Sequence, residues 1–136
     1  MNAVLLGDGP VVIVDDSDSD VLVARRCFRR SRIERELRAF PCGEDFLAFL
    51  DAVERGEEPM PSVVLLDINM PGLDGFEVLR RTRERSEFQA VPIFVMLTNS
   101  DSPRDVQAAN ELGANGYQVK PMRVEEYVAF FDSLVE

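Results

Sequence analysis

An α/β fold with a single doubly wound parallel sheet is the architecture that this sequence predicts. Short apolar runs rich in β-branched residues alternate five times with longer stretches whose apolar residues recur at helical spacing. Such strict alternation indicates five parallel strands and five helices, with helices on both faces of the sheet. The 136 residues suit one domain, and the 46% of hydrophobic residues are enough for a core.

The five expected strands are short, as strands buried within a parallel sheet usually are. The first is the continuous run Val-Val-Ile-Val at residues 11–14, which is apolar on both faces. The stretch at residues 37–40 is less apolar and is a weaker second strand. The remaining strands are expected at residues 63–66, 91–97 and 117–119.

Five helices are expected between and after these strands. Apolar residues three or four positions apart mark the inward faces of four of them, at residues 21–28, 46–53, 76–79 and 124–134. Asp74 can cap the third helix, with Glu77 three residues further on. Ser102 and Pro103 open the fourth helix, because proline suits the first helical position, and Gly113 follows its end.

Charge and composition exclude several classes of function. The net charge is −10, so the backbone of a nucleic acid would be repelled, and no nucleic-acid partner is expected. The chain has no histidine, which rules out Ser-His-Asp and Cys-His catalysis and histidine-ligated zinc. No apolar run approaches the ~20 residues of a membrane span, and residues 1–10 lack the basic start of a signal peptide. The two cysteines are far apart, so we expect reduced thiols in a cytoplasmic protein.

Polar residues follow the expected strands at the ends where parallel strands meet. Asp15 and Asp16 follow the first strand, Asp67 the third, Thr98 the fourth and Lys120 the fifth. Sites in doubly wound folds lie at these carboxyl ends, so the five side chains should converge on one crevice. Three carboxylates that close together would have raised pKa values unless something neutralises them, and a hard divalent cation does this. A lysine and a hydroxyl beside them favour a phosphoryl group.

Lys120 is the single lysine in a chain that has 14 arginines. A compact ammonium on a flexible stem suits a mobile ion pair with a carboxylate or a phosphoryl oxygen, which a planar guanidinium fits less well. The alternative is an ordinary surface lysine. The position of Lys120 at the end of a strand favours a role in the site.

Four segments carry a resemblance to a known family. They are Val-Val-Ile-Val-Asp-Asp at 11–16, Val-Leu-Leu-Asp-Ile-Asn-Met-Pro-Gly-Leu-Asp-Gly at 64–75, Met-Leu-Thr-Asn at 96–99 and Leu-Gly-Ala-Asn-Gly-Tyr-Gln-Val-Lys-Pro at 112–121. Together they resemble the receiver domain of two-component response regulators. The resemblance implies a flavodoxin-like, CheY-like fold with strand order 2-1-3-4-5. It also implies one receiver domain over residues 1–136, with its core at about residues 9–136, and no output domain.

The resemblance implies a role for each residue of the expected crevice. Asp67 would accept phosphate from a sensor histidine kinase. Asp15 and Asp16 would hold Mg²⁺, for which Mn²⁺ can substitute, together with Asp67 and the backbone carbonyl of Asn69. Thr98 would then hydrogen-bond the phosphoryl group, and Lys120 would pair first with Asp67 and then with that group.

Further roles come from the same resemblance. Tyr117 stands at the switch-aromatic position and would turn inward when Thr98 moves, although its spacing also fits a core aromatic. The peptide before Pro121 would be cis. Asn69 and Ser100 would tune the lifetime of the acyl phosphate. The protein would then be a phosphate acceptor with slow self-dephosphorylation rather than a turnover enzyme.

Other functions remain for comparison. A calcium loop from Asp16 fails, because Val21 and Cys27 stand where glycine and glutamate are needed. An aspartyl-phosphate hydrolase would need a second aspartate where Asn69 stands. A flavodoxin-like FMN site would have to bind the phosphate of FMN at the first loop, and the carboxylates of Asp15 and Asp16 would repel that phosphate.

The partners remain open at the level of the sequence. The chain would act either as a shuttle in a phosphorelay, through a phosphotransfer protein, or on a downstream protein target. The long stretch at residues 42–61 and the segment at 112–115 are similar to small regulators paired with bacterial phytochromes. A bacteriophytochrome kinase and a homodimer are therefore expected alternatives for its partners.

Overall fold

The sheet has five strands, all parallel, in the order β2-β1-β3-β4-β5. A computed structural model describes residue 5 and residues 7–135. Residues 1–4, 6 and 136 lie outside the described residues. All of them belong to the expected domain range 1–136, and residues 1–4 and 6 also belong to the segment in which no signal peptide was expected. The strands are β1 Val11–Val14, β2 Leu37–Phe40, β3 Val63–Leu66, β4 Phe94–Thr98 and β5 Gly116–Val119. The predicted fold class and strand order are confirmed.

The three central strands are apolar because helices cover both of their faces. Every residue of β1, β3 and β4 is buried, whereas β2 and β5 at the two edges are only partly buried. The helices are α1 Asp18–Arg30, α2 Gly43–Glu54, α3 Gly75–Glu84, α4 Pro103–Glu111 and α5 Val124–Asp132, with a short 3₁₀ helix η1 at Ser86–Phe88.

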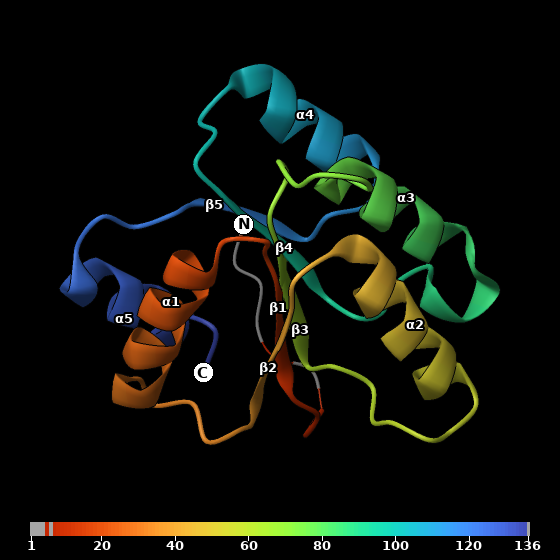
Figure 1. Ribbon diagram of the computed structural model, residues 1–136, viewed down its shortest axis with the longest axis horizontal. Coiled ribbons are helices and arrows are strands. Elements are labelled where there is room, and N and C mark those ends of the chain that lie inside the picture. The colour runs from red at the N-terminus through yellow and green to blue at the C-terminus, as the bar shows by residue number, and fades with distance from the viewer. Residues whose placement is uncertain (1–4, 6, 136) are drawn as a thin grey trace.

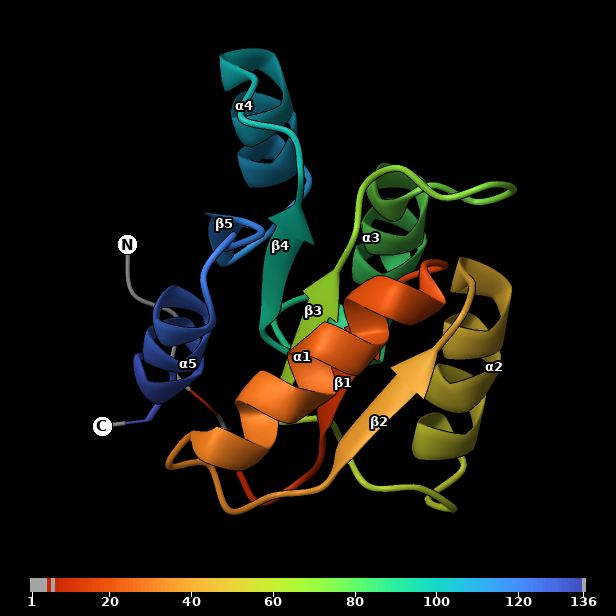
Figure 2. The same ribbon diagram turned by 60° about the vertical axis from the view of Figure 1, so that its left-hand side comes forward.

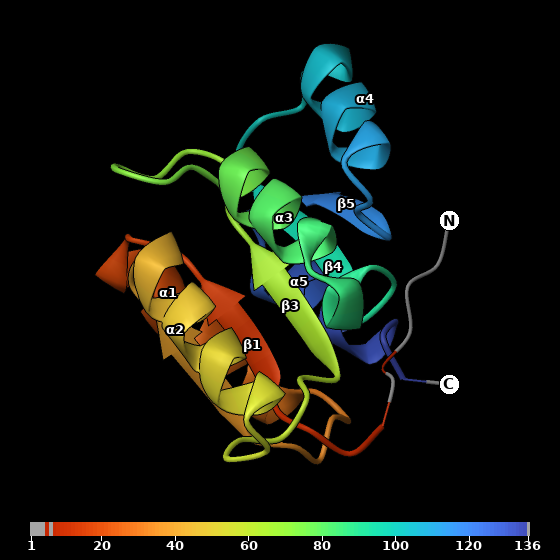
Figure 3. The same cartoon turned by 90° about the vertical axis from the view of Figure 1, so that its right-hand side faces the viewer.

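The helices form two layers around the sheet. Helices α1 and α5 lie on one face, and α2, α3 and α4 lie on the other (Figure 1). The first layer is centred on Phe131, which stacks on Tyr127 with ring centroids 5.3 Å apart. Helices α2 and α3 lie across the opposite face (Figure 3), where Phe46 meets Phe94 of β4 edge to face at 6.0 Å.

The signals predicted at the start of α3 and at both ends of α4 are found in the structure. Asp74 caps α3 by accepting a hydrogen bond from the backbone N–H of Glu77 at 2.9 Å. Pro103 opens α4, and Gly113 follows its end with a φ of +98°, a conformation that favours glycine. The boundaries of β4 differ: we expected a strand from residue 91, but it begins at Phe94, since Pro92 has no N–H for a ladder.

The topology fixes where a site can lie. The arrowheads of β2, β3 and β4 point to the same side of the molecule (Figure 2). The loops that follow β1, β3, β4 and β5 therefore meet at one end of the sheet. The polar residues predicted to converge come from these four loops and strand ends.

Candidate functional site

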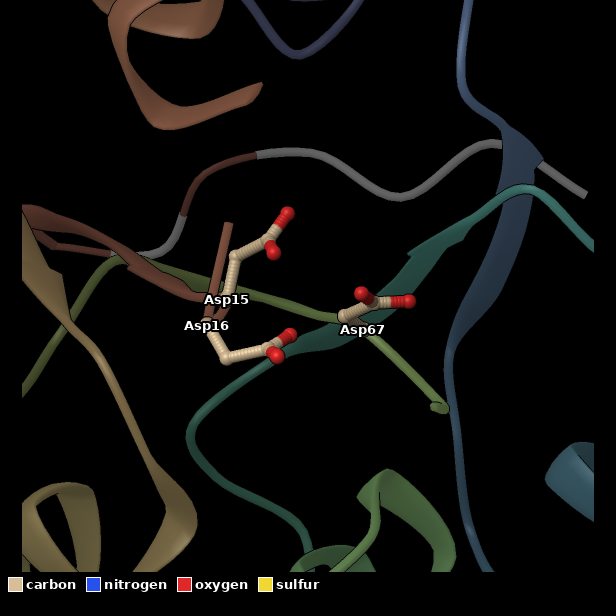
Figure 4. Close-up of side chains that lie close together, drawn as sticks. All are labelled: Asp15, Asp16 and Asp67. Carbon is tan, nitrogen blue, oxygen red and sulfur yellow. The ribbon is translucent and has the colours of Figure 1, made fainter. Parts of the chain in front are cut away.

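Three aspartates converge at the carboxyl ends of β1 and β3 (Figure 4). Asp15 and Asp16 follow β1, and Asp67 follows β3. One carboxylate oxygen of each lies within 4.8 Å of the others. Asp15 is 3% exposed and Asp67 is 8% exposed, whereas Asp16 reaches solvent. This arrangement matches the predicted convergence.

The backbone holds Asp67 firmly beside the first strand. Its N–H donates to the carbonyl oxygen of Val14 at 3.1 Å. Gly75, the first residue of α3, packs against it from the other side. A Cβ atom at position 75 would lie 2.1 Å from the Asp67 carbonyl oxygen, so only glycine allows this approach. The start of α3 therefore fixes the position of Asp67.

Lys120 reaches into the cluster from the end of β5. Its Nζ lies 2.7 Å from Asp15 Oδ2, 2.7 Å from Asp20 Oδ2 and 3.4 Å from Asp67 Oδ2. Its backbone N–H donates to the Thr98 carbonyl oxygen at 2.7 Å, which ties the loop after β5 to β4. The lysine is thus an internal counter-ion, with a side chain only 9% exposed.

Asp20 is the member of this site that the sequence did not reveal. It lies in the first turn of α1, and its contact with Lys120 is as short as that of Asp15. By sequence alone, an acidic residue at this place is expected to favour the start of the helix. With Asp20 the cluster holds four carboxylates, three of which contact the one ammonium, so its formal charge is −3, which a divalent cation would largely neutralise.

Burial and neighbouring charges shift two of the ionisable groups. Burial raises the pKa of the Asp67 carboxyl; Lys120 opposes this shift and the charge of Asp15 adds to it. Burial by itself would lower the pKa of Lys120. The hydrogen bonds to Asp15 and Asp20 and the charge of Asp67 outweigh burial and raise that pKa above its ordinary value.

Thr98 lies at the end of β4, fully buried, at the same end of the sheet. Its Oγ1 accepts a long hydrogen bond, 3.4 Å, from the backbone N–H of Ser100. The structure gives no hydrogen bond between Thr98 and Asp67 among the described residues. Ser100 in turn donates from its hydroxyl to Asp105 of α4 at 2.6 Å.

Tyr117 of β5 packs against the core cluster on the α2–α3–α4 face. Its hydroxyl donates to the Ser100 carbonyl oxygen at 2.9 Å, and burial raises the pKa of the phenol. It is therefore both a partial core aromatic and a link to the loop after β4. Asn69, two residues beyond Asp67, lies exposed beside the site.

The expectation of a cis peptide before Pro121 is wrong. Among the described residues the cis peptide is Val91–Pro92, in the loop before β4, and the Lys120–Pro121 peptide is trans. The trans isomer is the more stable form of an X–Pro bond by about 0.5–1 kcal/mol. Lys120 makes its three carboxylate contacts with the trans bond in place.

Comparisons with known proteins agree with this geometry. The sequence pattern of the family described as response regulator receiver domain matches residues 11–132. Response regulator Rcp1 of Synechocystis is 33% identical over 119 residues, which are 85% of this chain and 79% of that protein. Its Mn²⁺-bound crystal structure superposes with a TM-score of 0.78 at 30% identity, over 93% of this chain and 91% of that one.

Two further solved structures are similar over the same extent. Response regulator RPA3017, in red light signaling of R. palustris, has a TM-score of 0.83 at 34% identity and covers 93% of this chain and 90% of its own. The bacteriophytochrome response regulator RtBRR has a TM-score of 0.77 at 32% identity, and the match covers 93% of this chain and 77% of that one.

Within the described residues, no helix of this chain is long and apolar enough to cross a bilayer.

Proposed function

The chain belongs to the family of response regulator receiver domains, and from that premise we propose that it accepts a phosphoryl group on Asp67 and signals through protein contacts. The observation that carries the proposal is the placement of Asp67. It is a buried carboxylate held at the end of β3, within reach of two further aspartates and of the only lysine in the chain. That combination supplies a nucleophile and the positive charge that a transferred phosphoryl group requires.

The transfer requires that the carboxyl group of Asp67 be ionised. One of its oxygens forms a bond to the phosphorus of the donor's phosphohistidine. The bond from phosphorus to the imidazole nitrogen breaks, and the imidazole leaves with the electron pair. Burial opposes ionisation by raising the pKa of Asp67, and the ammonium of Lys120 favours it. Lys120 thus keeps the nucleophile ready in a buried place.

The three aspartates fit a divalent cation, since each offers one oxygen within 4.8 Å of the others. Asp15, Asp16 and Asp67 would hold Mg²⁺ with the backbone carbonyl of Asn69, and the Mn²⁺ of the related Rcp1 structure supports Mn²⁺ as a substitute. When bound, the ion neutralises carboxylate charge and the charge of the phosphoryl oxygens.

The response to phosphorylation would run through the loop after β4. The new group carries roughly −1.5 to −2 charge. The ammonium of Lys120 and the hydroxyl of Thr98 are the hydrogen-bond donors near this group. Movement of Thr98 would displace Ser100, because the backbone N–H of Ser100 donates a hydrogen bond to Thr98 Oγ1. The Tyr117 hydroxyl already donates a hydrogen bond to the Ser100 carbonyl oxygen, so Tyr117 would move with that loop. We expect Asn69 and Ser100 to flank the acyl phosphate and to set its lifetime.

Exposed apolar side chains on α1 and around the loop that follows Lys120 would suit contact with the donor protein. Among the described residues, the large apolar side chains that are exposed gather on α1 and between β5 and α5; they are Leu22, Val23, Val119, Met122 and Val124. Val23 and Val124 line one pocket together with arginines of α1. An apolar patch edged by positive charge suits a donor helix with apolar and acidic residues.

We further propose a sensor histidine kinase of the bacteriophytochrome type as the donor. Support comes from relatives described as acting in red light signaling or as bacteriophytochrome response regulators. The proposal leaves two alternative outputs, a terminal role on a protein target or a role in a relay, and it includes a homodimer. The proposal also includes action as a phosphate acceptor rather than a turnover enzyme, and a cytoplasmic location, which suits two free cysteines.

The test is phosphotransfer from a purified, phosphorylated bacteriophytochrome kinase, followed with labelled phosphate. Label should move to the wild-type chain when Mg²⁺ is present and not after chelation. Asp67→Asn should receive none, while Asp101→Asn, which alters an exposed carboxylate in the loop after β4, should behave as wild type. Label on the Asp67→Asn chain would end the assignment of Asp67. Failure with this kinase but success with another would end only the phytochrome part.

A further inference from the structure

Lys120 is shared among three carboxylates, and one of them has no place in the proposed transfer. The ammonium has three protons to donate. Its contacts are Asp15 and Asp20, each at 2.7 Å, and Asp67 at 3.4 Å. Asp20 belongs to the first turn of α1, so its ion pair joins that helix to the loop after β5. The ammonium is therefore fully used before any phosphoryl group arrives.

We propose that Asp20 is a positioning residue that holds Lys120 at rest and gives it up when Asp67 is phosphorylated. The proposal rests on the function proposed above. Lys120 contacts the Asp67 carboxylate at 3.4 Å and would pass this contact on to a phosphoryl group on Asp67. The ammonium then has to move to the new group, so one of its two 2.7 Å contacts, to Asp15 or to Asp20, must lengthen or break. Asp20 thereby competes with the phosphoryl group for the lysine and sets how readily the phosphorylated state forms.

Exposure decides which of the two short contacts gives way. The side chain of Asp20 is 40% exposed, whereas that of Asp15 is 2% exposed. Water can replace the ammonium at Asp20 at small cost, since half-exposed ion pairs contribute little. The same loss at buried Asp15 would leave an uncompensated charge away from water. The ion pair between Lys120 and Asp20 is thus the contact that can break and form again.

A purely structural role for Asp20 at the start of α1 can be tested by comparison with Asp18. A negative charge there would favour the helix dipole. Asp18 in the same turn offers the same charge, is exposed and has no ion pair among the described residues. The helix end is capped separately, because the Ser17 hydroxyl accepts from the backbone N–H of Asp20 at 3.2 Å. Asp18→Asn is therefore the matched control for Asp20→Asn.

The single lysine makes the contact directly observable. Selective labelling of lysine with ¹⁵N gives one side-chain signal, that of Lys120. In metal-free protein, Asp20→Asn should displace this signal, and Asp18→Asn should leave it in place. An unmoved lysine signal in Asp20→Asn would overturn the proposal before any phosphate chemistry is attempted.

The competition is measured with beryllium fluoride and Mg²⁺, a mimic of a phosphoryl group on a carboxylate. Asp20→Asn should bind the mimic more tightly by about two- to fivefold, the size of one half-exposed ion pair. Asp18→Asn should bind it as wild type does. Equal tightening in both variants would overturn the proposal, because general charge relief would explain it. If the wild type binds no mimic while the lysine signal still responds to Asp20→Asn, the proposed function fails and with it the competition, although the contact stands.

Discussion

Removing the ammonium of Lys120 should destabilise the metal-free protein strongly. Lys120→Met keeps an apolar stem of similar length but deletes the one positive charge that faces three carboxylates. The side chains of Lys120, Asp15 and Asp67 are 9%, 2% and 10% exposed, so the lost contacts are largely buried. Removing one partner from a buried pair costs about 3–5 kcal/mol, while the half-exposed Asp20 contact adds about 0–1 kcal/mol.

We therefore expect the free energy of unfolding of Lys120→Met to fall by at least about 3 kcal/mol, or roughly 10 °C in Tm for a domain of this size. The assay is urea denaturation near neutral pH in the presence of a chelator. Lys120→Arg is the control, because it retains the charge and should lose less stability while responding poorly to phosphorylation. The deficit of Lys120→Met should shrink when Mg²⁺ is added and when acid neutralises the carboxylates.

A loss below about 1 kcal/mol would refute this reasoning, since that is the range of solvated surface pairs. The double variant Lys120→Met with Asp67→Asn gives a second check. Removing the Asp67 charge should recover part of the stability lost with the lysine, because the two groups interact. Strict additivity of the two changes would contradict a direct ion pair.

Three further predictions follow from the same geometry. Burial raises the pKa of Asp67 above its ordinary value of 3.8, so the folded state holds this proton more tightly than the unfolded state, and ionisation costs stability at any pH above the raised value. Asp67→Asn should therefore be more stable than metal-free wild type near neutral pH, with urea curves that converge as the pH falls toward the ordinary value; a less stable variant would contradict this. Asp16→Ala should weaken Mg²⁺ binding at least about tenfold by titration calorimetry, because even indirect partners of a metal are worth that much; unchanged affinity would exclude Asp16 as a ligand. Asn115→Ala should cost about 1–3 kcal/mol in urea denaturation, because Asn115 Oδ1 accepts from the Phe94 N–H and from Arg83, both at 2.9 Å; a negligible loss would mean that water replaces it.

The convergence of the aspartates was predictable because topology leaves little choice. Buried strands at residues 11–14 and 63–66 are legible as continuous apolar runs. Once these strands are parallel neighbours, the residues that follow them must meet at one end of the sheet. Asp15, Asp16 and Asp67 come together for this reason, and Lys120 reaches them from the end of β5.

Asp20 was not predictable in the same way. Asp16, Asp18 and Asp20 alternate from just before α1 into its first turn, and nothing in their spacing says which one turns toward β5. Acidic residues are common in a first helical turn for the sake of the dipole, so the site role is hidden among ordinary ones. Only the position of the Lys120 stem in space distinguishes Asp20 from Asp18.

Two other differences have local physical causes. The isomer of an X–Pro bond depends on about 0.5–1 kcal/mol, which tertiary contacts decide, and the resemblance suggested the wrong proline. The 3₁₀ helix at Ser86–Phe88 is too short for a periodic pattern, although its Phe88 is fully buried. Neither difference moves the residues of the site.

The central claim is that Asp67 takes a phosphoryl group with the help of a divalent cation and Lys120. Intact-mass spectrometry after incubation with acetyl phosphate tests it most directly, because no partner protein is needed. The account predicts that the wild-type chain gains the mass of one phosphoryl group with Mg²⁺, that chelation prevents the gain, and that Asp67→Asn gains nothing. A wild-type chain without added mass, or an Asp67→Asn chain that acquires it, would contradict the account.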